Sequence, residues 1–232
     1  MSLAGPRQLV FDLATRPALG RADFFVSPAN RLALAQVDTW PAWPGGRLAI
    51  AGPAGAGKTH LAHVWAARSG ARLLPAAALA ALDIGALPEG AALVVEDVDR
   101  LPELPAAQAG AAEEALFHVA NRLAAAGALM VSGREPPARW AIRLPDLASR
   151  LRASPVARLE APDDALLAAV LLKLFGDRQI VVEVDLVQYL LTRMDRSFEA
   201  AEALVAELDR AALARRRPVT RVLAAEILRG AE

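Results

Sequence analysis

Cysteine is absent from this chain, and histidine is scarce. Without cysteine the chain can form no disulfide, offers no thiol nucleophile and has no cysteine metal site. The three histidines include one close pair, His60 and His63. Thiol chemistry and disulfide scaffolds are therefore excluded as functional classes.

Long apolar runs are also missing. No stretch approaches the roughly 20 apolar residues that a membrane-spanning helix needs, so we expect no membrane partner. The N-terminus lacks the apolar core of a signal peptide, which favours a cytoplasmic location.

The chain has no excess of charge of either sign, and it has almost no lysine. Its 26 basic residues balance 26 acidic residues, which argues against strong non-specific binding of nucleic acid by the whole surface. Lys58 and Lys173 are the only lysines, and all other basic residues are arginine. We attribute this bias to genomic base composition, and it makes the position of each lysine informative.

What the chain does have is enough apolar material for a core. With 232 residues and a hydrophobic fraction of 55%, it fits one large domain, or one domain with a small companion. Up to residue 161, short apolar runs alternate with segments of helical period, and this alternation predicts a parallel sheet with helices on both faces. The expected strands are 47–51, 72–74, 91–95, 128–131 and 156–159, and the expected helices are 60–68 and 113–126.

After Pro162 the pattern becomes helical. The expected helices are a first one from a cap at Asp163 or Asp164 to Phe175, ended by Gly176, and then 186–194, 197–215 and 220–228. The only further strand candidate is 180–182. The sequence therefore predicts an α/β domain followed by a small all-helical domain, with a hinge at Ala161-Pro162.

One glycine-rich stretch after the first expected strand matches G-x-x-x-x-G-K-[ST] completely. Such glycines let backbone N–H groups point inward, and the helix that follows adds its positive end, which is a phosphate-binding arrangement. In this pattern the lysine reaches the β- and γ-phosphates and the threonine hydroxyl binds Mg²⁺. The expected binding residues for ATP or ADP are Gly52, Pro53, Ala54, Gly55, Ala56, Gly57, Lys58, Thr59 and the adjoining His60.

Two carboxylates directly follow the expected strand 91–95. They are Glu96 and Asp97. In a P-loop protein, a carboxylate at this place holds the Mg²⁺ shell and the next one orients the attacking water. We therefore predict Thr59, Glu96 and Asp97 as metal-site residues, and both carboxylates as catalytic.

These motifs, together with Ser-Gly-Arg-Glu-Pro-Pro at 132–137 and Leu-Pro-Asp-Leu-Ala-Ser-Arg-Leu at 144–151, resemble the AAA+ ATPases of the bacterial replication-initiator (DnaA) group. Within that group the chain is most similar to the truncated, Hda-type regulatory inactivators. The resemblance implies a P-loop AAA+ parallel-sheet domain followed by a small all-helical lid. It also implies that Arg150 is an arginine finger, which reaches the nucleotide of a neighbouring subunit and stabilises charge on the transferring phosphoryl group.

Three departures from this family pattern bear on activity. Glu96 stands where the family usually has aspartate. In the sensor stretch, Arg134 replaces an acidic residue and leaves Ser132 as the candidate polar sensor. In the helical lid, Glu199 occupies the expected place of the sensor 2 arginine, and Arg196 lies one turn earlier. Because an acidic group repels phosphate, we expect hydrolysis or triphosphate preference to be altered.

The N-terminal stretch RQLVFDL leaves two interpretations open. It could form an edge strand of the domain. Family members carry a short QL-x-L-x peptide here that inserts into the replicative sliding clamp, so the resemblance favours a partner-binding peptide. Gln8 would then anchor by its amide, and Leu9, Phe11 and Leu13 would fill apolar pockets. We interpret residues 1–20 as this peptide and its tether.

The resemblance implies a nucleotide-binding AAA+ regulator of chromosomal replication initiation. It would dock on the clamp and promote hydrolysis of ATP held by a DnaA-type initiator, with homo-oligomers also possible. The alternatives are an autonomous AAA+ ATPase of the helicase-loader or remodelling type, and a P-loop kinase. No helix-turn-helix domain follows the helical patterns, so direct sequence-specific DNA binding is not expected. The predicted divisions are 1–20, 21–161 and 162–232.

Overall fold

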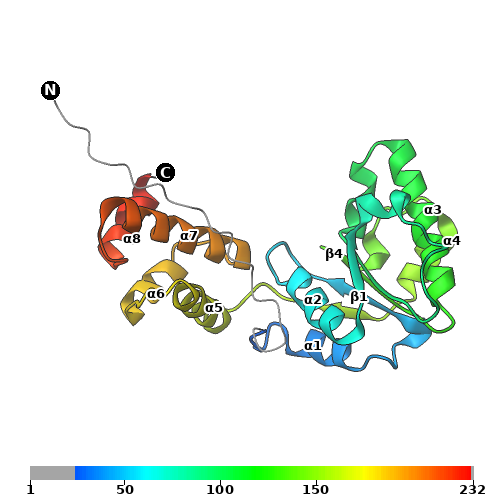
Figure 1. The fold of residues 1–232 in the computed structure, drawn as a ribbon, viewed down its shortest axis with the longest axis horizontal. Coiled ribbons are helices and arrows are strands. Elements are labelled where there is room, and N and C mark those ends of the chain that lie inside the picture. The colour runs from blue at the N-terminus through cyan, green and yellow to red at the C-terminus, as the bar shows by residue number, and fades with distance from the viewer. Residues whose placement is uncertain (1–23, 231–232) are drawn as a thin grey trace.

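A five-stranded parallel sheet forms the centre of the first part of the molecule. The computed structural model describes residues 24–230, and Figure 1 shows the sheet with helices on either side. The strand order is β2-β3-β4-β1-β5, and all four neighbouring pairs are parallel. The strands are β1 (Arg47–Ala51), β2 (Arg72–Pro75), β3 (Ala92–Glu96), β4 (Ala128–Gly133) and β5 (Val156–Arg158).

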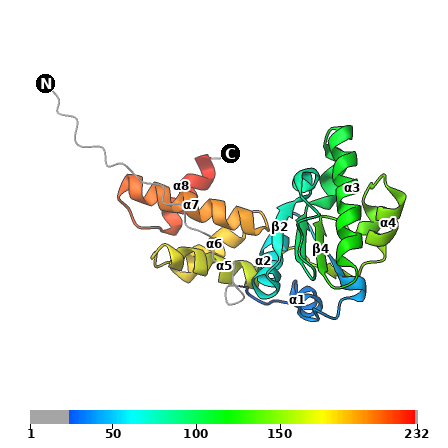
Figure 2. The ribbon, with the colours of Figure 1, turned by 45° about the vertical axis from the view of Figure 1, so that its right-hand side comes forward.

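Helices cover both faces of the sheet because the central strands are apolar on both faces. Alternate strand residues enter two separate cores: Ile50 and Met130 pack with α1 and α2, whereas Val95 and Val131 pack with α3 and α4. Figure 2 shows these helices on opposite sides. The helices are α1 (Arg31–Asp38), α2 (Lys58–Ser69), α3 (Ala106–Leu123) and α4 (Pro145–Arg152), with short 3-10 turns η2 (Pro44–Gly46), η3 (Ala76–Ala81), η4 (Val98–Glu103) and η5 (Pro137–Arg139). The predicted α/β fold with a parallel sheet is confirmed.

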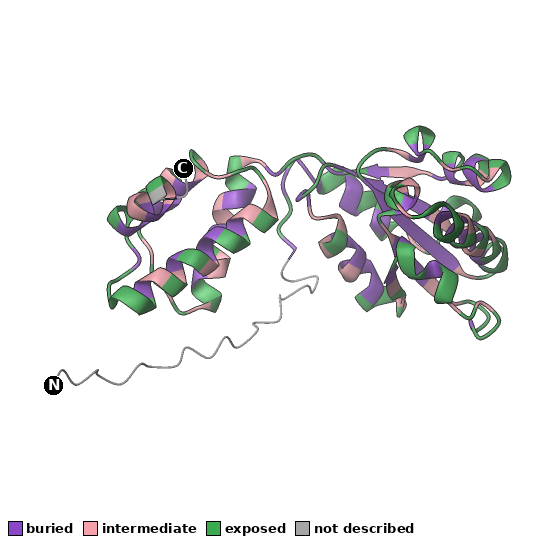
Figure 3. Cartoon of the chain, turned by 90° about the horizontal axis from the view of Figure 1, so that it is seen from above, coloured by how far each residue is buried: buried purple, intermediate pink, exposed green. Residues whose placement is uncertain are grey.

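The second part of the described chain consists of four helices around a third core. They are α5 (Asp164–Asp177), α6 (Val184–Leu191), α7 (Phe198–Arg215) and α8 (Arg221–Gly230). Phe175, Leu190 and Leu208 are almost fully buried in this core, and Figure 3 shows buried and exposed residues alternating along these helices. We call α5 to α8 the lid.

Side-chain caps define where two lid helices begin. Asp163 accepts a hydrogen bond from the Leu166 N–H at 2.8 Å, and Ser197 accepts one from the Ala200 N–H at 3.0 Å. These two residues satisfy N–H groups that the first helical turn leaves unpaired.

Several local predictions were wrong. Residues 180–182 form no strand, and Val181 is 95% exposed, because β-branched residues form a strand only where a sheet edge is available to pair with. Gly176 does not end α5, which continues to Asp177, and α3 begins at Ala106 rather than at residue 113. β4 extends to Gly133, so Ser132 lies inside a strand.

In the described range, no helix is both long enough and apolar enough to cross a bilayer. The divisions at residues 20/21 and 161/162 remain predictions.

Candidate nucleotide-binding site

The glycine-rich loop lies between β1 and α2, at the carboxyl end of the sheet. It is held against β4 because the Gly52 N–H donates to the Gly133 carbonyl at 3.3 Å. Gly55 and Gly57 have φ angles of +70° and +88°, which side-chain-bearing residues adopt only with strain. α2 begins at Lys58, so the loop and the positive end of this helix face the same point. This backbone geometry is of the kind that binds phosphate, and the assignment of these residues to a nucleotide remains a prediction.

Lys58 is folded back onto the loop. Its Nζ donates to the carbonyl oxygens of Gly52 and Pro53, each at 2.8 Å. These acceptors are backbone groups without net charge, so the ammonium keeps its full positive charge for an anion. The burial of Lys58 lowers its pKa from the ordinary lysine value.

Charges from three other segments act on this ammonium. The carboxylates of Asp97, Asp99 and Glu199 raise the pKa of Lys58, against the larger effect of burial, and Arg134 lowers it. Residues from the ends of β3 and β4 and from the start of α7 therefore converge on the P-loop lysine.

Of the three residues that the sequence predicts at a metal site, the structure joins Thr59 and Glu96 by a hydrogen bond. The Thr59 Oγ1 donates to Glu96 Oε1 at 2.7 Å, so the longer side chain of glutamate reaches the hydroxyl directly. A hydroxyl and a carboxylate are oxygen ligands that suit Mg²⁺, which commonly takes one or two protein groups and completes its shell with phosphates and waters. Residues 24–230 hold no group of three or more His, Asp or Glu side chains arranged to bind a metal. The residues present fit Mg²⁺.

The ends of β3 and β4 are tied together by two hydrogen bonds. The Asp97 N–H donates to Ser132 Oγ at 3.2 Å, and the Arg134 N–H donates to Asp99 Oδ2 at 2.7 Å. Asp97 has a left-handed backbone with φ of 56°, which an aspartate tolerates at a cost. Sequence reasoning did not assign a role to Asp99, although its signal was there: it belongs to the same acidic run as Glu96.

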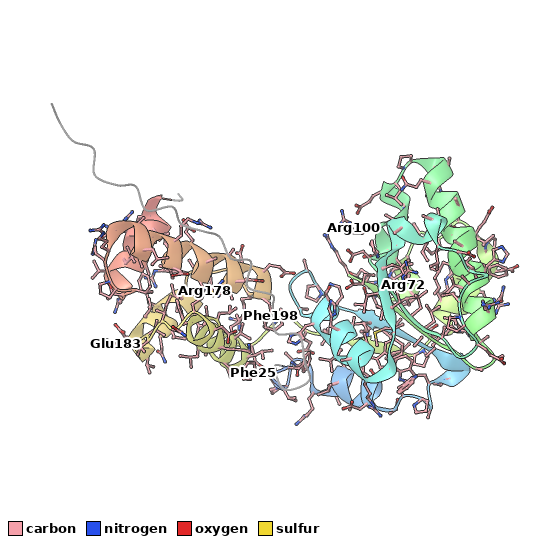
Figure 4. All side chains as sticks on the ribbon, viewed as in Figure 1. Phe25, Arg72, Arg100, Arg178, Glu183 and Phe198 are labelled. Carbon is pink, nitrogen blue, oxygen red and sulfur yellow. The ribbon has the colours of Figure 1, made fainter. Side chains whose placement is uncertain are left out.

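The lid touches the phosphate loop through the start of α7. The Phe198 N–H donates to the Gly55 carbonyl at 3.1 Å, and Figure 4 places Phe198 at the end of α7 that faces this loop. A Cβ on Gly55 would lie 2.2 Å from the Ser197 Cβ and 2.4 Å from a carboxylate oxygen of Glu199. Glu199 therefore lies directly beside the loop.

Arg196 does not take the place of the missing lid arginine. Its Nη1 forms a salt bridge with Asp164 Oδ1 at 2.8 Å, and about half of the side chain is exposed. Of the two sensor candidates in the lid, the structure brings only the acidic one to the P-loop.

Arg150 lies on α4 and packs on α3. Its Cζ is 5.2 Å from the centroid of the Phe117 ring, a cation–π distance. The burial of Arg47 lowers its pKa, and the charge of Arg150 lowers it further. Among the described residues no carboxylate is paired with the Arg150 guanidinium.

A buried acid that sequence reasoning missed fixes the start of α4. Glu113 on α3 is only 2% exposed, and its carboxylate accepts from the N–H groups of Arg143 and Leu144 at distances of 2.8 to 3.2 Å. Burial of a charge is tolerated here because these donors satisfy it. Glu113 and Phe117 are one helical turn apart, so one face of α3 holds both ends of the helix that carries Arg150.

The remaining predicted residues are His60 and the residues of the N-terminal peptide. His60 lies in the first turn of α2, and its imidazole packs edge-on against Phe24, with 5.2 Å between the ring centroids. The predicted partner-binding residues Gln8, Leu9, Phe11 and Leu13 lie outside the described residues.

Comparison with solved structures identifies the fold. Domain III of the Thermotoga maritima replication initiation protein DnaA superposes with a TM-score of 0.77 at 19% identity, covering 93% of this chain and 97% of that one. The fold is that of the AAA+ ATPases. No protein-family model matches the chain.

Two longer proteins match the chain over part of their length. A DNA replication initiation factor has a TM-score of 0.70 at 17% identity, over 84% of this chain and 65% of that one. The replication initiator DnaA bound to AMPPCP and single-stranded DNA has a TM-score of 0.65 at 18% identity, again over 84% and 65%. This chain thus spans about two thirds of the length of these initiators.

Proposed function

We propose that this chain is a nucleotide-binding AAA+ regulator of chromosomal replication initiation, which docks on the sliding clamp and promotes hydrolysis of ATP bound to a DnaA-type initiator. One observation carries the proposal. The molecule presents a P-loop with its Thr59–Glu96 pair at the carboxyl end of the sheet, and a separate, unpaired Arg150 on α4. The P-loop would bind a nucleotide in the chain itself, and Arg150 would reach the nucleotide of another subunit.

The nucleotide of the proposal is ATP or ADP with Mg²⁺. The loop from Gly52 to Gly57 would cradle the phosphates with its N–H groups, and Lys58 would turn from its carbonyl acceptors to them. Thr59 and Glu96 would hold the metal, which supplies positive charge beside the phosphates. The similarity to an initiator bound to AMPPCP supports this choice.

The arginine-finger role of Arg150 is supported by how the side chain is held. Stacking on Phe117 leaves the edge of the planar guanidinium available, and no described carboxylate neutralises it. Such a group, inserted beside a nucleotide in trans, stabilises the charge that spreads over the transferring phosphoryl group.

Clamp docking is assigned to residues 8–13. A short extended peptide binds by inserting a few apolar side chains into pockets, and Leu9, Phe11 and Leu13 supply them. The partners of the proposal are therefore the clamp and the initiator, and homo-oligomers would use the same Arg150 face. The proposal includes no sequence-specific contact with DNA.

Clamp docking is tested by retention on immobilised sliding clamp. The wild-type chain is expected to be retained, and the double variant Gln8→Ala with Leu9→Ala is expected to be lost. The control is Leu32→Ala, an exposed leucine on α1, which should bind as the wild type does. Equal retention of the double variant would reject the docking role.

The trans role is tested by the rate at which the initiator hydrolyses ATP in the presence of loaded clamp. Arg150→Ala should lose the stimulation almost completely, since removal of an arginine finger costs about 10³-fold or more. Arg152→Ala is the matched control, because Arg152 is an exposed arginine in the same last turn of α4. If both variants stimulate equally, Arg150 is not the finger.

An autonomous ATPase is the second candidate. It is favoured by the hydrogen bonds that order Glu96, Asp97 and Ser132 within a single chain. ATP turnover by the isolated protein separates the two: the regulator needs initiator and clamp, whereas the motor does not.

A further inference from the structure

A second arginine, Arg47, acts on Arg150 through its charge and has no partner of its own. Arg47 is the first residue of β1, and its side chain is only partly exposed. Its Nε is buried without a hydrogen-bond partner, and its guanidinium forms no ion pair with any residue of the 24–230 range. A buried donor that is left unpaired costs free energy, and nothing in the described chain offsets that cost for Arg47.

The register of the sheet brings Arg47 to the end of α4 that carries Arg150. β5 pairs with β1 at Ala49, whose N–H donates to the Pro155 carbonyl at 2.9 Å. Because Arg47 lies two residues before Ala49, it is level with the turn that joins α4 to β5. In that turn the Ser154 hydroxyl donates to the Arg150 carbonyl at 3.2 Å. Both arginines therefore lie at the amino end of the sheet, away from the P-loop of their own chain.

Arg47 also lies on the face of the sheet that α4 covers. Side chains alternate between the two faces along a strand, so Arg47 shares the face of Ala49. Ala49 packs in the core that contains Leu151 of α4, whereas Leu48 packs in the opposite core. The guanidinium lies against the turn ahead of β1, where a Cβ on Gly45 would be 3.1 Å from its Nη2.

The charges around Arg47 differ from those around Lys58. Three carboxylates raise the pKa of Lys58, whereas burial and the charge of Arg150 both lower the pKa of Arg47. Arg47 and Arg150 are thus two neighbouring cations, and no carboxylate of the described residues is paired with either one. Like charges at short range disfavour each other, and an anion from another molecule would remove this repulsion.

We propose that Arg47 is a second contact in trans, which binds together with Arg150 the phosphates of the nucleotide held by a neighbouring subunit. The inference rests on the proposed finger role of Arg150 and adds to it a second cation. A polyphosphate presents several charged oxygens side by side, so two planar guanidinium groups can contact it at once. A single carboxylate is already satisfied by one guanidinium fork, which favours phosphate over an acidic side chain of the partner.

The test measures initiator ATP hydrolysis over a range of concentrations of this chain, with loaded clamp present. Arg47→Ala is expected to lower the maximal stimulated rate about tenfold, as for loss of one charge-assisted contact. The concentration for half-maximal stimulation should change less than about twofold, because a contact made in the transition state affects the rate rather than docking. Arg47→Lys should recover part of the rate, since lysine keeps the charge but loses the fork.

Arg72→Ala is the matched control. Arg72 is likewise the first residue of its strand, but it is exposed, and β3 and β4 separate its strand from β1, so its removal should change neither quantity. The midpoint of thermal unfolding of the isolated chain should not fall in Arg47→Ala. Burial and Arg150 both disfavour the charged form of Arg47 in the folded state, so a charge that opposes folding is removed.

Arg150→Ala, measured alongside, separates this inference from the proposed function. An unchanged maximal rate in Arg47→Ala, with Arg150→Ala inactive, would overturn the inference alone. An unchanged rate with a raised half-maximal concentration would mean that Arg47 binds an acidic side chain of the partner, and would also overturn the phosphate contact. A lower thermal midpoint, with a rate that Arg47→Lys does not recover, would assign Arg47 to folding. Full stimulation by Arg150→Ala, or none by the wild type, would overturn the proposed function and the inference with it.

Discussion

The two halves of the phosphate site are built very differently. The half at the strand ends carries a lysine, a hydroxyl–carboxylate pair and two hydrogen bonds that join β3 to β4. The half in the lid brings an acidic side chain, Glu199, to the same loop, and its other sensor candidate, Arg196, is paired with Asp164. One half is suited to attract phosphate, and the other repels it.

This difference separates binding from lid closure. On the proposed function, the strand-end half alone would hold the nucleotide, whereas a lid that closes on the phosphates would bring the negative charge of Glu199 toward them. We therefore expect the lid position to respond to the charge of the bound nucleotide, which is a conformational readout rather than an aid to hydrolysis.

The largest expected effect comes from removing the central cation of the strand-end half. Lys58→Ala should weaken ATP binding about 100-fold, or about 2.8 kcal/mol, because a charge-assisted contact to phosphate is lost. Fluorescence titration with a labelled nucleotide measures this. Lys173→Ala is the control, as it removes the only other lysine, which is paired with Asp177 in the lid; a similar loss in both variants would contradict the assignment.

The next effect breaks the contact between the two halves. Gly55→Ala should lower the free energy of unfolding by about 3 kcal/mol. The alanine backbone would have to adopt a positive φ, and its methyl group would overlap with Ser197. Gly70→Ala is a close control, because Gly70 has the same φ of +70° and nothing within 4 Å, so it should cost only about 1 kcal/mol. Chemical denaturation gives both values, and equal costs would mean that the lid does not lie against the loop.

Replacing the acidic side chain of the lid half by a basic one should make both halves attract phosphate. Glu199→Arg is expected to tighten ATP binding about tenfold, or about 1.4 kcal/mol, since a repulsive charge becomes attractive. Glu202→Arg, which is exposed on the same helix, controls for net charge. Calorimetry would contradict the assignment if the two substitutions had the same effect.

The smallest effect is expected from the other lid candidate. Arg196→Ala removes an exposed salt bridge and should change the free energy of unfolding by less than about 0.5 kcal/mol, with no change in ATP affinity. A tenfold loss of affinity in the same titration would instead make Arg196 the lid's phosphate ligand, and the contrast between the halves would disappear.

The strands and the P-loop could be predicted because their signals are local. Apolar runs of about five residues identified β1 and β3, and the spacing of Gly52, Gly57 and Lys58 described a loop whose geometry depends on neighbouring backbone. The fold followed from alternation of these segments. Residues 180–182 were wrongly predicted as a strand from the same kind of local signal. Their β-branched composition does not reveal whether a partner strand is present.

The remaining parts depend on contacts between distant residues. Glu113 reaches the start of α4 across 30 positions, and Asp99 reaches Arg134 across 35; neither bond leaves a pattern in the chain. The convergence of Arg134 and Glu199 on Lys58 is of the same kind, because it needs the register of β1 with β4 and the placement of α7 together.

The hydrogen bond from Phe198 to Gly55 has a consequence for α7 itself. Phe198 is the first residue of that helix, and its N–H is one of the donors that no helix can satisfy internally. The P-loop carbonyl thus completes the first turn of a helix that belongs to the lid. Amide exchange at Phe198 should therefore report directly on whether the lid is docked, and proline at this position, which helices accept, would delete the contact while leaving the helix intact.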